Sequence, residues 1–128
     1  MGRRAATLDE LLKKPARTKE VTLKLSGEDG SVHEVFIRLK ALGSQAYDDL
    51  LAEHPPTAEQ KKEGSTYNAD TFAPALIAAC AVEPSMTTSE AKQIWTSDEW
   101  SRGEVTELFF ACVEVCSKGL DVPFTETV

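Results

Sequence analysis

Two neighbouring segments near the start of the chain alternate apolar and polar residues, which predicts a pair of half-buried β-strands. The apolar positions are Val21, Leu23 and Leu25 in the first segment, and Val35, Ile37 and Leu39 in the second. The intervening "SGEDGS" contains Gly27 and Gly30, which suit a turn. His33 falls on the apolar face of the second segment, close to its start. We therefore expect an N-terminal β-hairpin with one apolar face.

After the hairpin, apolar residues recur at helical spacing. The segments are "QAYDDLLAEH", the polar "TAEQKKEG", the nearly apolar "TFAPALIAACAV", "SEAKQIW", and a last helix that ends at Gly119. Ser44 is the expected N-cap of the first segment, and Asn68 or Asp70 that of the third. The third segment contains Pro74, so we expect that proline in the first turn, where its missing N–H is tolerated.

Four capping boxes mark helix starts, because a Ser or Thr hydroxyl is followed three residues later by Glu or Gln. The pairs are Thr7 with Glu10, Thr57 with Gln60, Thr87 with Glu90, and Ser101 with Glu104. The first opens a helix from Leu8 to Lys14 that Pro15 ends. A helix of about seven residues is not stable alone. Its apolar stripe of Leu8, Leu11 and Leu12 must therefore dock on the body or on a partner.

These elements predict an α+β fold: an N-terminal β-hairpin followed by a bundle of about four or five helices, with a short N-terminal arm helix. We divide the chain into three parts: residues 1–18 form a basic arm with the short amphipathic helix, residues 19–119 a single α+β domain, and residues 120–128 a C-terminal tail. A length of 128 residues with 41% hydrophobic residues is enough for one real core.

The stretch "FFACVEVCSKG" sets Cys112 and Cys116 one helical turn apart, which raises the question of a thiol or metal site. Both cysteines lie on the apolar face of the last helix with Val105, Leu108, Phe109 and Val113. A zinc site would require a second ligand pair, whereas Cys80 stands alone in the sequence and the histidines, His33 and His54, lie elsewhere. We interpret the sulfurs as core packing and expect no metal and no cofactor.

The net charge of −7 is unevenly distributed. Residues 1–24 carry seven Lys/Arg against three Asp/Glu, whereas the remaining residues carry seven against eighteen. An acidic body argues against a duplex-binding domain, so nucleic acid is an unexpected partner, although the basic arm leaves that alternative open. No apolar stretch approaches the roughly 20 residues of a membrane span, and the first residues lack the apolar run of a secretory signal. Three cysteines without such a signal indicate reduced thiols in a cytosolic setting.

Candidate chemistry is sparse in this sequence. It contains no phosphate-binding loop, no G-x-S-x-G and no H-E-x-x-H. The adjacent carboxylates Asp48-Asp49 and Asp98-Glu99 point about 100° apart on a helix and form no acid–base pair. We therefore expect a protein that is not an enzyme. Trp95 and Trp100 bracket "TSDE" and form either a helix–helix corner packed on the core or an aromatic patch that faces a partner.

Several stretches together resemble the tail assembly chaperones of long-tailed (siphovirus-type) phages and prophages of actinobacteria. They are "TLDELL", "RTKEVTLKL", "ALGSQAYDDLLAEHPPTAEQKKEGSTYNADTFAPALIAACAVEP", "IWTSDEWSRGEVTELFFACVEV" and "KGLDVPF". The most specific pieces are "HPPT", "FAPALIAACAVEP", "EWSRGE" and "GLDVPF". The resemblance extends from Thr7 to Phe124, and none of these pieces is a catalytic signature.

The resemblance implies a non-enzymatic role in building a phage tail. Such a chaperone coats the tape measure protein, keeps it soluble, and gives way as the tail tube protein polymerises. It would act in the cytoplasm of the infected or lysogenic bacterial host and be absent from the mature virion. The family offers no catalytic or ligand residues to carry over, so Leu8, Leu11, Leu12, Trp95 and Trp100 are partner-binding candidates from the residues alone.

Self-association is a further expectation, because a basic arm is complementary to the acidic body of a neighbouring copy. Two alternatives remain open at this point: a structural tail or head–tail connector protein retained in the virion, and a small interaction or regulatory module. The sequence leaves open the oligomeric state, the tape measure segment that is bound, and a longer frameshifted form. It also leaves open the host, and whether the arm helix docks in cis or on a partner.

Overall fold

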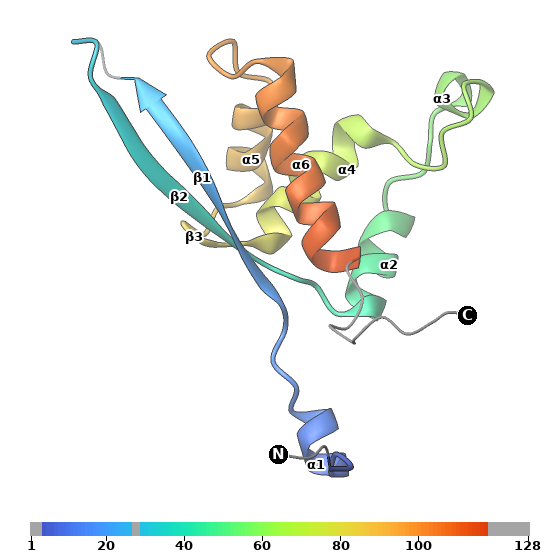
Figure 1. The fold of residues 1–128 in the computed structure, drawn as a ribbon. Coiled ribbons are helices and arrows are strands. Elements are labelled where there is room, and N and C mark those ends of the chain that lie inside the picture. The colour runs from blue at the N-terminus through green and yellow to red at the C-terminus, as the bar shows by residue number, and fades with distance from the viewer. Residues whose placement is uncertain (1–3, 27–28, 118–128) are drawn as a thin grey trace, which may run out of the picture.

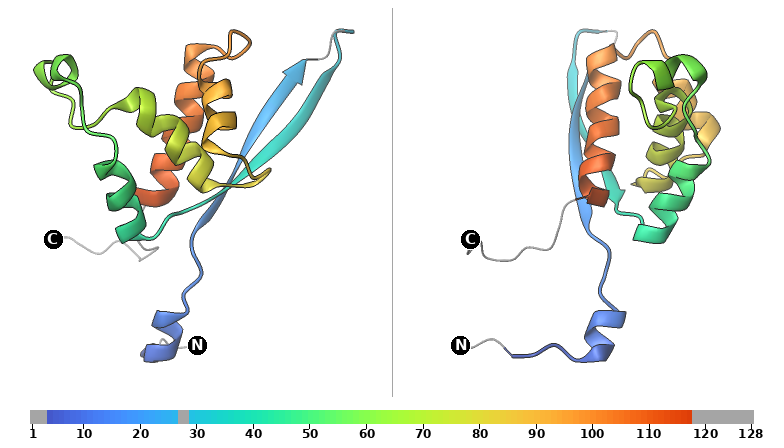
Figure 2. Two further views of the ribbon diagram at one scale, coloured as in Figure 1. Left: turned by 180° about the vertical axis from the view of Figure 1, so that it is seen from behind. Right: turned by 90° about the vertical axis from the view of Figure 1, so that its right-hand side faces the viewer.

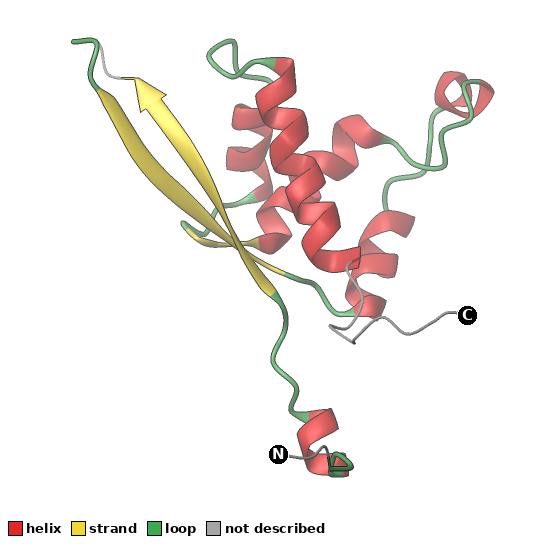
Figure 3. Ribbon diagram, in the orientation of Figure 1, coloured by secondary structure: helices red, strands yellow, loops and turns green. Residues whose placement is uncertain are grey.

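A computed structural model describes residues 4–26 and 29–117 of the chain. In chain order the elements are α1 (Leu8–Leu12), β1 (Thr18–Ser26), β2 (Val32–Lys40), α2 (Ser44–Ala52), α3 (Ala58–Lys62), α4 (Ala69–Cys80), β3 (Ala81–Glu83), α5 (Thr88–Trp95) and α6 (Arg102–Ser117). Figure 1 shows a helical body with a long hairpin along one side and α1 standing apart below it. Coloured by secondary structure, the strands form one sheet, and α2, α4, α5 and α6 lie together beside it (Figure 3). The fold class is α+β, as predicted.

The hairpin forms in the register that the apolar alternation requires. Val21 lies opposite Ile37 and Leu23 opposite Val35, so these residues share one face. Ile37 and Leu39 are buried there, and Val21 and Leu23 are half-buried against the core. Further along the hairpin, Val35 and Leu25 are exposed. The helices therefore cover only the part of the hairpin nearest the arm.

A third strand was not predicted. The sequence reads as a simple break after the apolar helix, whereas Ala81–Glu83 continues directly from α4 as β3 and pairs antiparallel with β2. Glu83 lies opposite Arg38 and forms an ion pair with it, and Arg38 also contacts Glu20 on β1 at 2.7 Å. Three residues are too few to show a two-residue period, so this strand is defined by its partner and not by its own pattern.

The four capping boxes all form, with hydrogen bonds in both directions between each hydroxyl residue and its Glu or Gln partner. Asn68 caps α4, one of the two residues expected there. Two details differ from the prediction. Gly43, without a side-chain hydrogen bond, is the N-cap of α2 in place of Ser44, which is the first helical residue. Pro74 lies inside α4, beyond its first turn.

Pro74 is tolerated in the second turn because the middle of α4 is buried on all sides. The missing N–H leaves the carbonyl of Asp70, near the start of the helix, without its usual donor. Residues 72–77 are all buried, so the helix is held by contacts on every side rather than by its own hydrogen bonds. The predicted end of α6 at Gly119 and the C-terminal tail lie outside the described residues, and β1 begins at Thr18, at the predicted boundary of the arm.

The core is built around Phe72 of α4. Its ring packs edge-on against Tyr67 (5.3 Å between ring centroids), Tyr47 (5.9 Å) and Phe109 (6.0 Å). Edge-to-face geometry at these separations adds to the free energy of apolar burial. On α6, Val105, Leu108, Phe109 and Cys112 are buried as predicted. Val115 is also buried, whereas the predicted Val113 and Cys116 are only half-buried.

The buried base of the hairpin gives the first prediction. Ile37→Asp places an unpaired carboxylate where the side chain is 6% exposed, and should lower the free energy of unfolding by at least about 3 kcal/mol. Val35→Asp is the matched control, since Val35 lies on the same strand face but is 39% exposed. Urea unfolding followed by circular dichroism measures both. An Ile37→Asp variant as stable as the control would show that this face does not form the core.

Candidate partner-binding site

The arm helix α1 presents its three leucines to solvent. Leu8, Leu11 and Leu12 are 70%, 63% and 75% exposed. Residues 13–17 separate α1 from the sheet, and in two views at right angles α1 lies clear of the helices of the body (Figures 1 and 2). No residue of α1 is buried. The leucine stripe therefore has no docking site in cis within residues 4–26 and 29–117.

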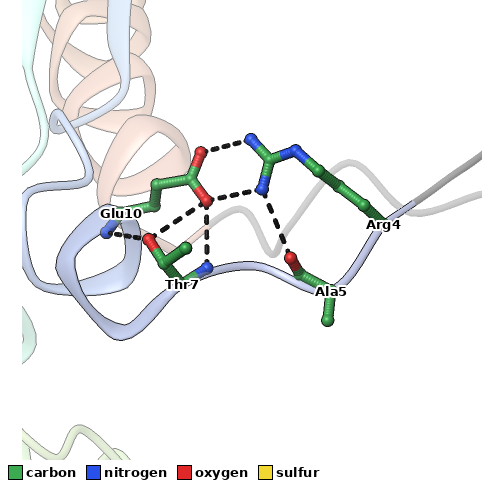
Figure 4. Close-up of polar contacts among 4 residues, drawn as sticks. All are labelled: Arg4, Ala5, Thr7 and Glu10. Carbon is green, nitrogen blue, oxygen red and sulfur yellow. Dashed lines mark hydrogen bonds and ion pairs between the residues drawn. The ribbon is translucent and has the colours of Figure 1, made fainter.

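A polar network fixes the first turn of α1 (Figure 4). The backbone N–H of Glu10 donates to Thr7 Oγ1 at 3.2 Å, and the Thr7 N–H donates to Glu10 Oε1 at 2.9 Å. The Arg4 guanidinium donates to both carboxylate oxygens of Glu10, at 2.8 and 2.6 Å. The Arg4 hydrogen bonds, followed by that of the Thr7 backbone, lower the pKa of Glu10 to about 2. Arg4, Thr7 and Glu10 thus organise a helix that is too short to persist on propensity alone.

The surroundings of α1 suit a protein partner better than a small ligand. A hollow of about 450 Å³ beside α1 is wide open to solvent, and its lining residues are Arg4, Ala6, Glu10, Leu11 and Lys14. Small-molecule sites bury most of their ligand, which an open hollow does not do. An exposed leucine stripe on a tethered helix has the form that helix-in-groove recognition uses.

The tryptophan corner lies at the other end of the molecule, at the α5–α6 connection (Figure 1). Trp95 is 8% exposed, its ring packs edge-on against Phe109 at 6.0 Å, and the Arg102 guanidinium lies 5.0 Å from the ring centroid. Trp100 is half-buried against the core. Trp95 thus has the surroundings of a core residue, and the structure does not bring the two tryptophans together with the leucines. The partner-facing interpretation of this corner stays a prediction, with Trp100 as its more accessible member.

The sequence suggested that Cys80 stands alone, but in the structure it contacts another cysteine. Its Sγ lies 3.6 Å from the Sγ of Cys116, at the junction of α4 and α6, and the Leu42 N–H donates to Cys116 Sγ at 3.4 Å. Contact with the Cys112 thiol raises the pKa of Cys80 to about 12, and the neighbouring Cys80 thiol followed by burial raises that of Cys116. Raised thiol pKa values leave little thiolate, the form that attacks electrophiles or binds metal. The sulfurs pack as neutral groups.

Sequence reasoning missed a second set of exposed apolar residues. Leu25, Val32, Val35 and Phe36 lie on the part of the hairpin remote from the arm, and Phe110 lies on α6 with 60% of its side chain exposed. The alternation along the strands correctly gave the faces, but it does not indicate how far the helices reach along them. The adjacent pair Phe109-Phe110 carried the available signal, because two neighbouring residues on a helix cannot both face the same core.

No protein-family model matches the chain, and neither curated proteins nor solved structures give a match. Within the described residues, no group of three or more His, Cys, Asp or Glu side chains is arranged to hold a metal ion. The described helices also include none that is both long and apolar enough to cross a membrane.

Replacing the buried thiols tests their packing role. Cys80→Ala and Cys112→Ala should each lower the free energy of unfolding by about 1–2 kcal/mol, because both side chains are fully buried. Cys116→Ala, at a half-buried position, should have the smaller effect. Urea unfolding measures the differences, and elemental analysis of the purified protein checks metal content. Stoichiometric zinc that disappears with any of these changes would contradict the packing role.

The network at α1 predicts a pH dependence. The pKa of Glu10 is depressed from its ordinary 4.5 to about 2, so the capping interaction is complete above pH 4.5 and is lost as the pH falls through about 2. An NMR titration of the Glu10 side chain should therefore give a midpoint well below 4.5. Arg4→Ala should raise that midpoint, whereas Lys14→Ala, which removes a charge that does not contact Glu10, should leave it in place. An ordinary midpoint in the unaltered protein would mean that the network does not persist in solution.

Proposed function

We propose that this protein is a non-enzymatic tail assembly chaperone of a long-tailed phage or prophage, which binds the tape measure protein through α1. The observation that carries the proposal is the exposed leucine stripe of α1, preorganised by Arg4, Thr7 and Glu10 and tethered to an acidic body. The resemblance over Thr7 to Phe124 supplies the client. A tape measure protein is a long, mostly helical rod with apolar stripes, and such a rod aggregates unless it is covered before the tube encloses it.

The size of the stripe suits reversible binding. Burying three leucine side chains gives on the order of 5 kcal/mol, and the loss of translational and rotational freedom offsets much of that gain. One arm therefore binds weakly and is displaced when tail tube subunits compete for the rod. Many weak contacts along a rod still add up to a coat.

The charge distribution is consistent with the same role. Beyond residue 24 the chain carries seven Lys/Arg against eighteen Asp/Glu, so copies bound along a rod present a negative outer surface. Such a surface keeps an apolar client in solution by mutual repulsion between complexes. This proposal places the protein in the cytoplasm of the bacterial host and leaves it out of the finished virion.

Two alternative functions use the leucines or the basic residues of the same arm. A structural tail or head–tail connector protein would use the same exposed leucines but remain in the particle, so mass spectrometry of purified virions separates it from a chaperone. A nucleic-acid-associated regulator would use the basic residues of the arm, and its binding to DNA would fall steeply with salt. Arg4 is already bidentate to Glu10, which lowers its availability for phosphate.

Pull-down after co-expression with the tape measure protein tests the proposal. A variant with Leu8, Leu11 and Leu12 all replaced by serine should fold normally, since none of the three is buried, yet recover much less client. A chain starting at Pro15 should behave alike, because it keeps the Arg17 carbonyl that accepts the Ala41 N–H at 2.8 Å.

The matched control replaces Val32 and Val82, which are 62% and 43% exposed, by serine. It removes exposed apolar surface elsewhere and should recover the client as the unaltered protein does. Equal recovery by the leucine variant and the control would rule out α1 as the contact and make Trp100 the next residue to change.

A further inference from the structure

The outer edge of β1 has its backbone groups directed away from the sheet. The Ala41 N–H donates to the Arg17 carbonyl at 2.8 Å, and this pair continues the register of the hairpin. Antiparallel pairs alternate between hydrogen-bonded and non-hydrogen-bonded, so every second residue from Arg17 onward bonds to β2. The N–H and C=O groups of Glu20, Thr22 and Lys24 therefore point outward. Within the described residues, β1 pairs with β2 alone, and the hairpin borders the molecule in the right-hand view of Figure 2.

This edge lacks most of the usual protections against strand addition, although it carries the charged residues Lys19, Glu20 and Lys24. β1 is nine residues long, contains no proline and has no bulge in its pairing with β2. Edge strands that remain unpaired are normally short, bulged, interrupted by proline, covered, or lined with charged side chains that repel a wrong partner. A long and regular edge is instead a template for another strand.

We propose that β1 pairs antiparallel with β1 of a second copy of this chain, about a two-fold axis at Thr22. In that register Thr22 lies opposite Thr22 of the second copy, and Glu20 lies opposite the second copy's Lys24, and the reverse. Glu20 and Lys24 are both exposed. Two opposite-charge pairs and a threonine pair across the new ladder are the kind of cross-strand contacts that stabilise sheets. Thr22, Glu20 and Lys24 also share the outward backbone direction, so the same register completes the hydrogen bonds.

An exposed aromatic ring completes the interface on the helix side. Lys19 Nζ lies 2.5 Å from the Glu114 carboxylate, and Phe110 lies one helical turn before Glu114 on the same side of α6. Phe110 thus borders β1, with 60% of its side chain exposed. The proposed register sets Leu23 and Leu25 of the second copy opposite Val21 and Lys19 on this face. Phe110 covers those leucines in the dimer. The dimer therefore buries an aromatic ring that is exposed to water in the isolated copy.

The dimer has a consequence for the arms, which rests on the proposed function of α1. Antiparallel β1 strands place the two arms at opposite ends of the shared ladder. Nine residues span roughly 30 Å. Two weak leucine stripes at that separation contact one rod at two points and bind it more tightly than either does alone.

Complementary charge variants test the register without a client. In Glu20→Lys, lysines face lysines across the ladder, and in Lys24→Glu, glutamates face glutamates. Each variant alone should dimerise about tenfold more weakly or worse than the unaltered chain. Mixed in equal amounts, they should form a heterodimer. Position 20 of the Glu20→Lys variant then faces position 24 of the Lys24→Glu variant with opposite charge, and the unaltered Lys24 of the first faces the unaltered Glu20 of the second. Light scattering after size exclusion measures mass, and native mass spectrometry separates heterodimers from homodimers.

Circular dichroism must show both variants folded, because Glu20 also contacts Arg38. Phe110→Ala is an independent test. Its side chain is exposed, so its removal should leave the fold intact but weaken the dimer. An unaltered chain that stays monomeric would overturn the proposal. Dimers that survive both charge variants unchanged, or variants that fail to rescue each other, would exclude this edge. Neither result depends on whether α1 binds the tape measure protein.

Discussion

The structure depends on burying the middle of α4, where six consecutive residues, 72–77, are apolar. Residues 72–77 are all buried, so a partner element is needed in each direction. These elements are α5, α6 through Phe109 and α2 through Tyr47, and Leu39 of the sheet belongs to the same core. A helix of that kind gains little from its own hydrogen bonds and much from its surroundings, which is why Pro74 is accepted in its second turn. The strand β3 follows from α4 directly and ties that helix to the sheet.

Packing around α4 also leaves two segments of the chain, the far end of the hairpin and α1, outside the core. The sheet packs on the helices through Ile37 and Leu39 of β2 and through Val21 and Leu23 of β1, so the hairpin continues beyond its support with Leu25, Val32 and Phe36 in solvent. A two-stranded ribbon without cover is marginally stable in water. At the other end of the hairpin, residues 13–17 carry α1 away from the body, with its leucines exposed. Both features are extensions from a compact core, and both carry the apolar groups that the core left unused.

Local chemistry predicted most of the fold. The capping boxes located the starts of α1, α3, α5 and α6 because a hydroxyl and a carboxylate or amide three residues apart act without tertiary help. The period-two pattern gave the hairpin and its buried face. Three features were not predicted, because each depends on a segment distant in the chain. They are strand β3, the position of Pro74 in the second turn of α4, and the Cys80–Cys116 contact. The leucine stripe was visible in the sequence, but its exposure was not, since an amphipathic pattern is the same whether it faces a core or water.

The distribution of exposed apolar groups argues for interaction surfaces rather than for incomplete packing. Single exposed apolar side chains are ordinary, but here they gather on α1, on the free part of the hairpin and at Phe110, while the rest of the surface is strongly acidic. An acidic surface opposes indiscriminate association, so apolar groups can remain exposed without causing aggregation. The two sites also differ in kind. In the proposed roles, the stripe on α1 would accept an apolar groove, whereas β1 would require a partner whose charges match at Glu20 and Lys24. If both proposals hold, the chain would distinguish its own copies from its client by the chemistry of the contact alone.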